Sequence, residues 1–244
     1  MIDLVAAEWL KLRTTRLLHG AIPLAVALSF AAVAGEVVAA DGARALESSD
    51  GIAHVLAVTG TGALVVLIVG IMMSAGEYRH GTVADTFLTT PRRQRVIAAK
   101  LAVGAGLGLA VGLVTSLTCL GIAGLLYAVE GATFPFGDGE VWLILAGALV
   151  YIALFAVVGV ALGALVRNQV LAVALALAWF AVVEHTLVNL VPDVGRWLPV
   201  AAGQAIVRTP IDGLLSPLAG TALLAAYGAA IALAGVRAAG TRDT

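Results

Sequence analysis

Six long apolar runs dominate the sequence. A helix needs roughly 20 apolar residues to cross a bilayer, and each run is about that long or longer. None alternates with the period of two that a barrel strand shows, so each run predicts a membrane-spanning helix. The runs cover residues 17–40, 52–75, 101–129, 141–166, 170–190 and 218–236.

The composition agrees with these runs. The 244 residues are 61% hydrophobic and only 12% charged, and their mean hydropathy is +1.04. Soluble domains carry about 45–50% apolar and about 25% charged residues, so a soluble enzyme domain and a disordered chain are both excluded. We therefore expect an all-α integral membrane protein with six transmembrane helices.

The first apolar run follows basic residues and could be mistaken for a signal peptide. Lys11, Arg13 and Arg16 precede it, and residues 32–34 resemble a cleavage site. The apolar core of a signal peptide is only about 7–15 residues long, whereas this run extends over 17–40. We therefore expect a retained first helix.

The charged residues predict the orientation of the helices. With the N-terminus inside, eleven of the fourteen Lys and Arg residues fall on inner segments, and ten of the fifteen acids fall on or near outer ones. The inner side then carries +6 and the outer side −7, which together give the formal net charge of −1. Because positive residues favour the cytoplasmic side, both termini are predicted to be cytoplasmic.

The N-terminal segment 1–16 has a helical pattern of its own. Ile2, Val5, Trp9 and Leu12 form one stripe of the predicted helix, and the polar residues lie opposite. This pattern is typical of an amphipathic helix that lies in the membrane interface, with its basic residues facing anionic lipid. A basic leader that only fixes the orientation of the chain is the alternative.

The inner loop 76–100 between the second and third runs contains a short predicted helix. Gly81 permits a sharp turn, Thr82 followed by Asp85 resembles a capping box, and Pro91 ends the helix. This helix presents Phe87 and Leu88, which are apolar side chains suited to docking a soluble partner. The alternative is a connector whose apolar residues lie on the membrane surface.

Small residues recur at four-residue spacing within two runs and predict close packing of helices. The sequence contains no G-x-x-x-x-G-K-[ST] motif, so this chain is not expected to hydrolyse ATP itself. The spaced glycines are Gly104, Gly108, Gly112, Gly159 and Gly163.

Polar residues cluster near the end of the fifth run. Glu184, His185 and Asn189 either line a substrate path or form a polar helix end in outer water. The outer segment 191–217 that follows contains four of the seven prolines, which predicts short interfacial or re-entrant helices rather than a span. Trp197 lies within it and is a candidate for an outer gate.

The inner segments resemble a known family. The loop is similar to the intracellular loop of type-2 ATP-binding-cassette exporter permeases, and the N-terminal segment and the outer Trp197-Leu198-Pro199 also resemble that family. The residues that match its patterns are Glu8-Trp9-Leu10-Lys11-Leu12-Arg13 with Arg16, Glu77, Gly81-Thr82, Leu88, Pro91, Arg92 or Arg95, and Ala99-Lys100.

The resemblance implies a function. The loop would form a coupling helix that contacts a separate nucleotide-binding ATPase subunit, which binds ATP and Mg²⁺, while this chain binds no cofactor or metal. A second permease subunit, identical or homologous, would complete an exporter in the cytoplasmic membrane, with no role for nucleic acid. The residues expected to contact the ATPase are Glu77, Gly81, Thr82, Phe87, Leu88, Arg92 and Arg95.

The expected substrate is amphipathic: a lipid, drug, peptide antibiotic or glycolipid. The few charged residues within the spans argue against a strongly ionic cargo. The chain is then a transport subunit and not an enzyme, with an interfacial helix over 1–16 and a permease domain over 17–244. The alternative function is an ion- or proton-coupled secondary transporter without an ATPase partner, which would require broken helices and ionisable groups near the midplane.

Overall fold

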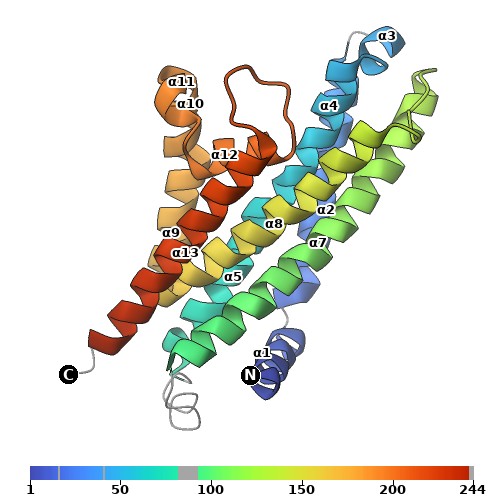
Figure 1. Ribbon diagram of the computed structural model, residues 1–244. Coiled ribbons are helices and arrows are strands. Elements are labelled where there is room, and N and C mark those ends of the chain that lie inside the picture. Colours follow the sequence, from blue (N-terminus) through green and yellow to red (C-terminus); the bar gives the residue numbers. More distant parts are fainter. Residues whose placement is uncertain (16, 41, 82–92, 242–244) are drawn as a thin grey trace.

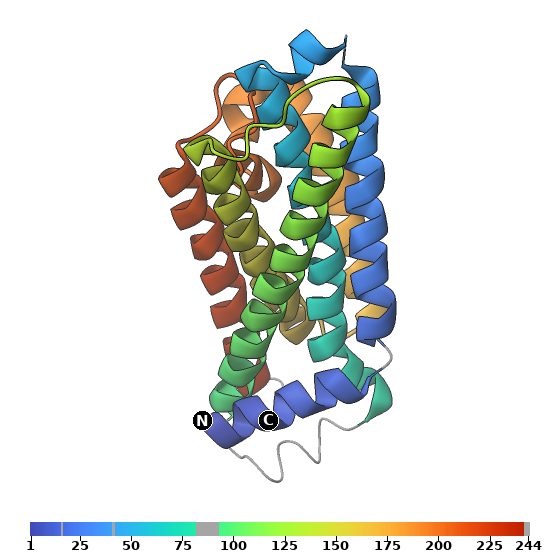
Figure 2. The same ribbon diagram turned by 90° about the vertical axis from the view of Figure 1, so that its right-hand side faces the viewer.

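The computed structural model describes residues 1–15, 17–40, 42–81 and 93–241. The regular secondary structure in these ranges is helical, with no strand, which confirms the predicted all-α class. The long helices run side by side as one bundle, and a short helix lies across one end of it (Figures 1 and 2).

Five helical segments in the described ranges are long and apolar enough to cross a membrane. They correspond to five of the six predicted runs and are formed by α2 (Leu17–Ala39), α4 (Ser49–Ala57) continued by α5 (Gly62–His80), α7 (Arg93–Val129), α8 (Gly139–Val166) and α13 (Pro217–Thr241). A 3₁₀ turn, Val58–Thr61, joins α4 to α5.

The run 170–190 has a different structure. It begins as α9 (Gln169–Leu177), widens into a π-helix over Ala178–Val183 and ends as α10 (Glu184–Leu190). Its apolar helix Gln169–Phe180 is shorter than the five long ones. This run is not one of the five long apolar helices, and a sixth span remains a prediction.

Two ends of the bundle can be distinguished. The helix α1 (Ile2–Thr14) crosses one end, and both chain termini lie there (Figure 2); we call this the α1 end. The opposite end, here the far end, carries α3 (Ala43–Leu46), the start of α4 and α11 (Pro192–Gly195) (Figure 1). The helix α12 (Pro199–Ile206) lies near it.

The helix α8 lies at the centre of the core and packs against α5, α7 and α13. Glycines allow the backbones to approach closely. An added Cβ on Gly108 would lie 2.5 Å from the Cα of Ala153, and one on Gly163 would lie 2.6 Å from the carbonyl oxygen of Ile71. Gly104, Gly112 and Gly159 likewise face Val160, Leu149 and Leu67 across helix interfaces.

One predicted boundary is corrected. The loop predicted over 76–100 is shorter, because α5 continues to His80 and α7 already begins at Arg93. In α1, Ile2 of the predicted apolar stripe is 85% exposed and Leu12 is buried. The carboxylate-bearing Glu8 is also buried, and the apolar pattern did not predict this. The contact of the stripe with the membrane interface stays a prediction.

Candidate functional site

Four charged side chains meet at the α1 end of the bundle. The Nζ atom of Lys100, on α7, lies 2.5 Å from Oε2 of Glu8 on α1 and 2.8 Å from Oε1 of Glu77 on α5. Lys11, one turn after Glu8 on α1, lies 2.9 Å from Oε1 of Glu8 and 2.8 Å from Oε1 of Glu77. We call these four residues the ionic cluster.

The two lysines of the ionic cluster differ in exposure. The side chain of Lys100 is only 5% exposed, whereas that of Lys11 is 46% exposed. Partial burial alone would lower the pKa of Lys11, but its hydrogen bonds to Glu77 and Glu8 outweigh that effect, and the pKa is raised above the ordinary 10.5. Buried charges are tolerated when each has a close partner, and the two acids and two lysines satisfy this condition.

The ionic cluster joins three elements of the chain. It fixes α1 to the end of α5 and to the first part of α7. In the sequence, Glu77 precedes the segment 82–92 and Lys100 follows it. Glu77 was predicted to contact an ATPase, but its carboxylate is mostly buried and is held by two lysines of its own chain. The role that its position supports is to fix α5 rather than to offer a free carboxylate.

The other predicted contacts divide into two groups. Thr82, Phe87, Leu88 and Arg92 lie outside the described residues. Gly81 ends α5 in the left-handed region with φ 71°, where its N–H bonds the carbonyl of Glu77. Arg95 is exposed on the first turn of α7.

Arg167 is a residue that sequence reasoning missed. It follows α8 in a left-handed conformation, with φ 58°. Its guanidinium lies 5.4 Å from the centre of the Tyr78 ring on α5 and donates a hydrogen bond of 2.9 Å to the carbonyl oxygen of Ala238 on α13. Arg167 therefore links the ends of three helices at the end of the bundle where the ionic cluster lies.

Glu184 lies in the bundle and not in water. Its side chain is fully buried, at 0% exposure, so the alternative of a solvated helix end is wrong for this residue. Its Oε1 accepts a hydrogen bond from the N–H of Val200, in the first turn of α12. A carboxylate at this place satisfies a free N–H group and interacts favourably with the helix dipole.

Two other residues of the predicted outer path are exposed, unlike Glu184. Asn189 is exposed near the end of α10, and Trp197 is exposed in the turn before α12. The carbonyl oxygen of Trp197 accepts a hydrogen bond of 3.2 Å from the Tyr227 hydroxyl on α13. His185 follows Glu184 on α10.

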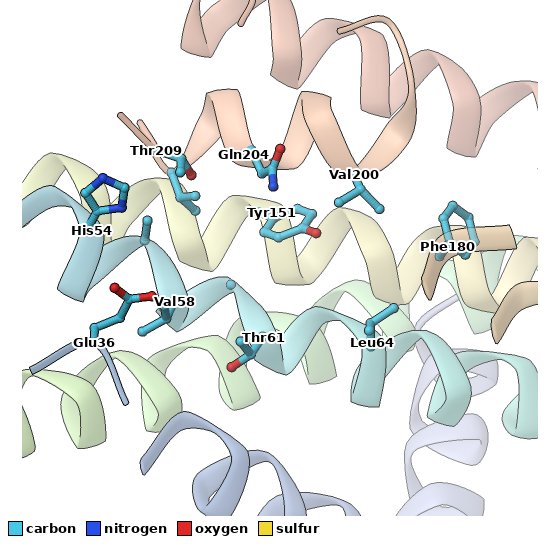
Figure 3. Close-up of a pocket in the computed structure, with 13 residues that line it drawn as sticks. Glu36, His54, Val58, Thr61, Leu64, Tyr151, Phe180, Val200, Gln204 and Thr209 are labelled. Atoms are coloured by element: carbon cyan, nitrogen blue, oxygen red, sulfur yellow. The ribbon is translucent and has the colours of Figure 1, made fainter. Parts of the chain in front are cut away.

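A pocket of about 290 Å³ lies elsewhere, between α2, α4, α5, α8, the π-helix and α12. Figure 3 shows Tyr151 of α8 at its middle. Two glycines make room for this ring: an added Cβ on Gly60 would lie 2.9 Å from it, and Gly203 contacts its other edge. The residues that line the pocket extend from 36 to 209 in the sequence, so no local pattern predicted it.

The pocket is polar at one end and apolar at the other (Figure 3). Glu36, His54 and Thr209 lie at the end nearer the far end of the bundle, and Leu64, Phe180 and Val200 lie at the opposite end. Thr61 and Gln204 lie between them. His54 is exposed and Phe180 is buried, so the polar end is the more open one. A molecule with one polar and one apolar end would match this arrangement.

Comparison with known proteins gives a family match. A family model described as ABC-2 family transporter protein matches residues 4–183 of the 244. The matched range includes all four residues of the ionic cluster and most of the residues that line the pocket. A search of curated proteins finds no match to the chain.

Proposed function

The chain belongs to the ABC-2 family of transporter proteins, and from this premise we propose that it is the permease subunit of an ATP-driven exporter. It moves an amphipathic substrate out across the cytoplasmic membrane. A separate nucleotide-binding subunit binds ATP and Mg²⁺ and supplies the free energy. A second permease subunit, identical or homologous, completes the membrane part of the transporter.

The ionic cluster is the observation that carries this proposal. Residues on both sides of the segment 82–92, Glu77 and Lys100, bond to the same helix α1. A force applied to that segment therefore reaches α5, α7 and α1 together rather than one helix alone. This is the connection that an ATPase docked at the α1 end needs in order to tilt the spanning helices.

Exposed charge at the α1 end supports the same orientation. Arg13, Arg79 and Arg95 are all exposed there, as expected for a cytoplasmic surface that faces anionic lipid headgroups. The ATPase subunit then docks from the cytoplasm, against α1 and the segment 82–92. The pocket, which is nearer the far end, lies in the outer half of the bundle.

One observation favours the alternative of a secondary transporter. The π-helix Ala178–Val183 interrupts a membrane helix directly before the buried Glu184, and broken helices with ionisable groups are typical of that class. Oε1 of Glu184 accepts a hydrogen bond from the first turn of α12, however, which supports a structural role, while its Oε2 is buried without a hydrogen-bond partner among the described residues. Dependence on an ATPase decides between the two functions.

The test is association and ATP hydrolysis. The full chain is co-expressed with nucleotide-binding subunits from the same source, and the purified complex is assayed for vanadate-sensitive ATP hydrolysis. We expect a stable complex that Phe87→Asp breaks. The control is Phe136→Asp, which introduces the same charge at a residue 52% exposed between α7 and α8.

Two results would contradict the proposal. If no nucleotide-binding subunit associates with the chain and transport proceeds with an ion gradient alone, the secondary transporter is correct. If the complex forms but survives Phe87→Asp intact, the segment 82–92 does not form the docking contact.

A further inference from the structure

The charge of the pocket limits what it can bind. Among the described residues that line the pocket, Glu36 is the one carboxylate, and none is a lysine or an arginine. Within the described part of the chain, Glu36 makes no ion pair. A half-buried carboxylate without a cationic neighbour attracts a positive group and repels an anionic one. His54 is the other titratable group at this end.

The pocket also offers hydrogen-bond acceptors that have no donor. The Oγ1 atom of Thr61 and the Oε1 atom of Gln204 are buried, and neither has a hydrogen-bond partner among the described residues. Buried polar atoms in folded proteins almost always have a partner, so two unsatisfied oxygens along one pocket indicate a missing donor. They lie on opposite sides of the Tyr151 ring (Figure 3), so the middle of the pocket has polar groups on two walls.

The opposite end of the pocket needs an apolar group. Leu64, Phe180 and Val200 line it, and Phe180 packs with its ring 5.4 Å from that of Phe155. This end contains no charged side chain among the lining residues. An alkyl chain would exclude water from it, whereas a second charged group would be desolvated without a partner.

Together these features define one class of ligand. We propose that the pocket binds amphiphiles with a primary ammonium group, which lies beside Glu36 while the alkyl part extends past Tyr151 toward Phe180. This inference rests on the proposed function, because it names the substrate class of the amphipathic cargo. Anionic and uncharged amphiphiles of the same length are the disfavoured ligands.

Binding to the permease alone tests the inference. The full chain is placed in nanodiscs of zwitterionic lipid, and binding of radiolabelled octylammonium is measured after subtraction of empty nanodiscs. Octanol, octanoate and octyltrimethylammonium compete for the site. We expect octanol and octanoate to compete at least tenfold more weakly, because they lack the positive charge. Octyltrimethylammonium should also be weaker, because it has no N–H group to donate to the Glu36 carboxylate.

Variants distinguish binding of octylammonium in the pocket from its general partition into the membrane. Glu36→Gln should weaken octylammonium binding at least tenfold, since it removes the charge and keeps the shape. Glu130→Gln is the matched control, because Glu130 is an exposed acid after α7 and does not line the pocket. We expect it to bind like the parent protein.

A second readout covers the case in which Glu36→Gln does not fold. In a Cys119→Ala background, His54→Cys places a thiol at the open end of the pocket. Octylammonium should slow its labelling by maleimide, and octanol at the same concentration should not.

The inference is overturned if octanol binds as tightly as octylammonium, if Glu36→Gln folds and binds normally, or if the maleimide reaction is unaffected. None of these measurements needs an ATPase. A complex with an ATPase but no ammonium preference refutes only the ligand class. Ammonium binding without any ATPase complex refutes only the exporter.

Discussion

The Nζ atom of Lys100 lies 2.5 Å from Oε2 of Glu8, a residue 92 positions earlier in the chain. This buried contact brings the N-terminal helix against α7 and makes α1 part of the bundle. A helix held only by its amphipathic face would lie on the membrane and move independently of the spans. The contact therefore determines whether α1 and α7 move together at the α1 end.

The variant Lys100→Met is expected to destabilise the protein. It leaves two mostly buried carboxylates with only Lys11 as a partner, and breaking a buried ion pair costs about 3–5 kcal/mol. Thermal unfolding in detergent measures the effect. Lys11→Met should cost less, because Lys11 is 46% exposed and solvent screens its charge. The reverse order would show that Lys100 is not the central residue of the cluster.

Removing both partners should be better tolerated than removing one. In Glu8→Met/Lys100→Met the pair Glu77–Lys11, at 2.8 Å, remains balanced. Replacing a buried ion pair by apolar groups is often neutral, whereas an orphaned charge is costly. We expect the double variant to unfold at a higher temperature than Lys100→Met. If their costs simply add, Glu8 and Lys100 are not coupled.

High pH should weaken the attachment of α1. The pKa of Lys11 is raised in the folded state, so its contribution is fully present below pH 10.5 and is lost as the pH rises through the raised value. The melting temperature should therefore fall above pH 10.5. In Lys11→Arg the fall should begin at higher pH, because the guanidinium stays protonated. Identical profiles for both proteins would exclude Lys11 as the titrating group.

The spans were predictable because their signal is local. Residues 141–166 are apolar throughout, and α8 ends at Val166 as the sequence predicts. The bond between Glu8 and Lys100 was not predictable in this way, although both residues belong to the segments that resemble the exporter family. The apolar pattern of α1 describes a stripe for the membrane interface, and it contains no signal for the ion pair that buries Glu8 against the bundle.

The pocket and the surroundings of Glu184 depend on tertiary structure. Glu184 occurs near a proline-rich segment, which is compatible with water at a helix end. Only the packing of α12 against α10 gives the carboxylate an N–H partner. The Tyr151 ring similarly requires Gly60 and Gly203 from different elements. Such contacts join residues far apart in the sequence, so single-segment patterns do not contain them.

Gly106 and Gly108 lie on different faces of α7 and provide a matched pair of positions for testing helix packing. An added methyl group on Gly108 would meet the backbone of Ala153 at 2.5 Å, whereas one on Gly106 meets nothing within 4 Å. Gly108→Ala should lower the melting temperature, because α7 and α8 must separate. Gly106→Ala should leave it unchanged or raise it, since alanine favours a helix by up to about 1 kcal/mol over glycine. Equal effects would contradict the close packing.

The carboxylate of Glu184 should stabilise the first turn of α12. Glu184→Ala removes the acceptor for the N–H of Val200, and loss of a capping side chain costs about 0.5–2 kcal/mol. Glu184→Gln keeps an acceptor oxygen but loses the interaction of its charge with the helix dipole, worth about 0.3–1 kcal/mol. Hydrogen exchange of a peptide covering α12 should therefore be fastest in the alanine variant and intermediate in the glutamine variant.

The control for this series is Asp193→Ala. Asp193 is an almost fully exposed acid on α11, and its nearest cation, Arg196, is 3.8 Å away, so its removal should leave exchange in α12 unchanged. If Glu184→Ala also leaves exchange in α12 unchanged, the carboxylate does not stabilise that helix. Its burial beside a π-helix would then favour a role in proton coupling. In that case transport by the Glu184→Gln variant, unlike transport by the parent protein, would not respond to an imposed proton gradient.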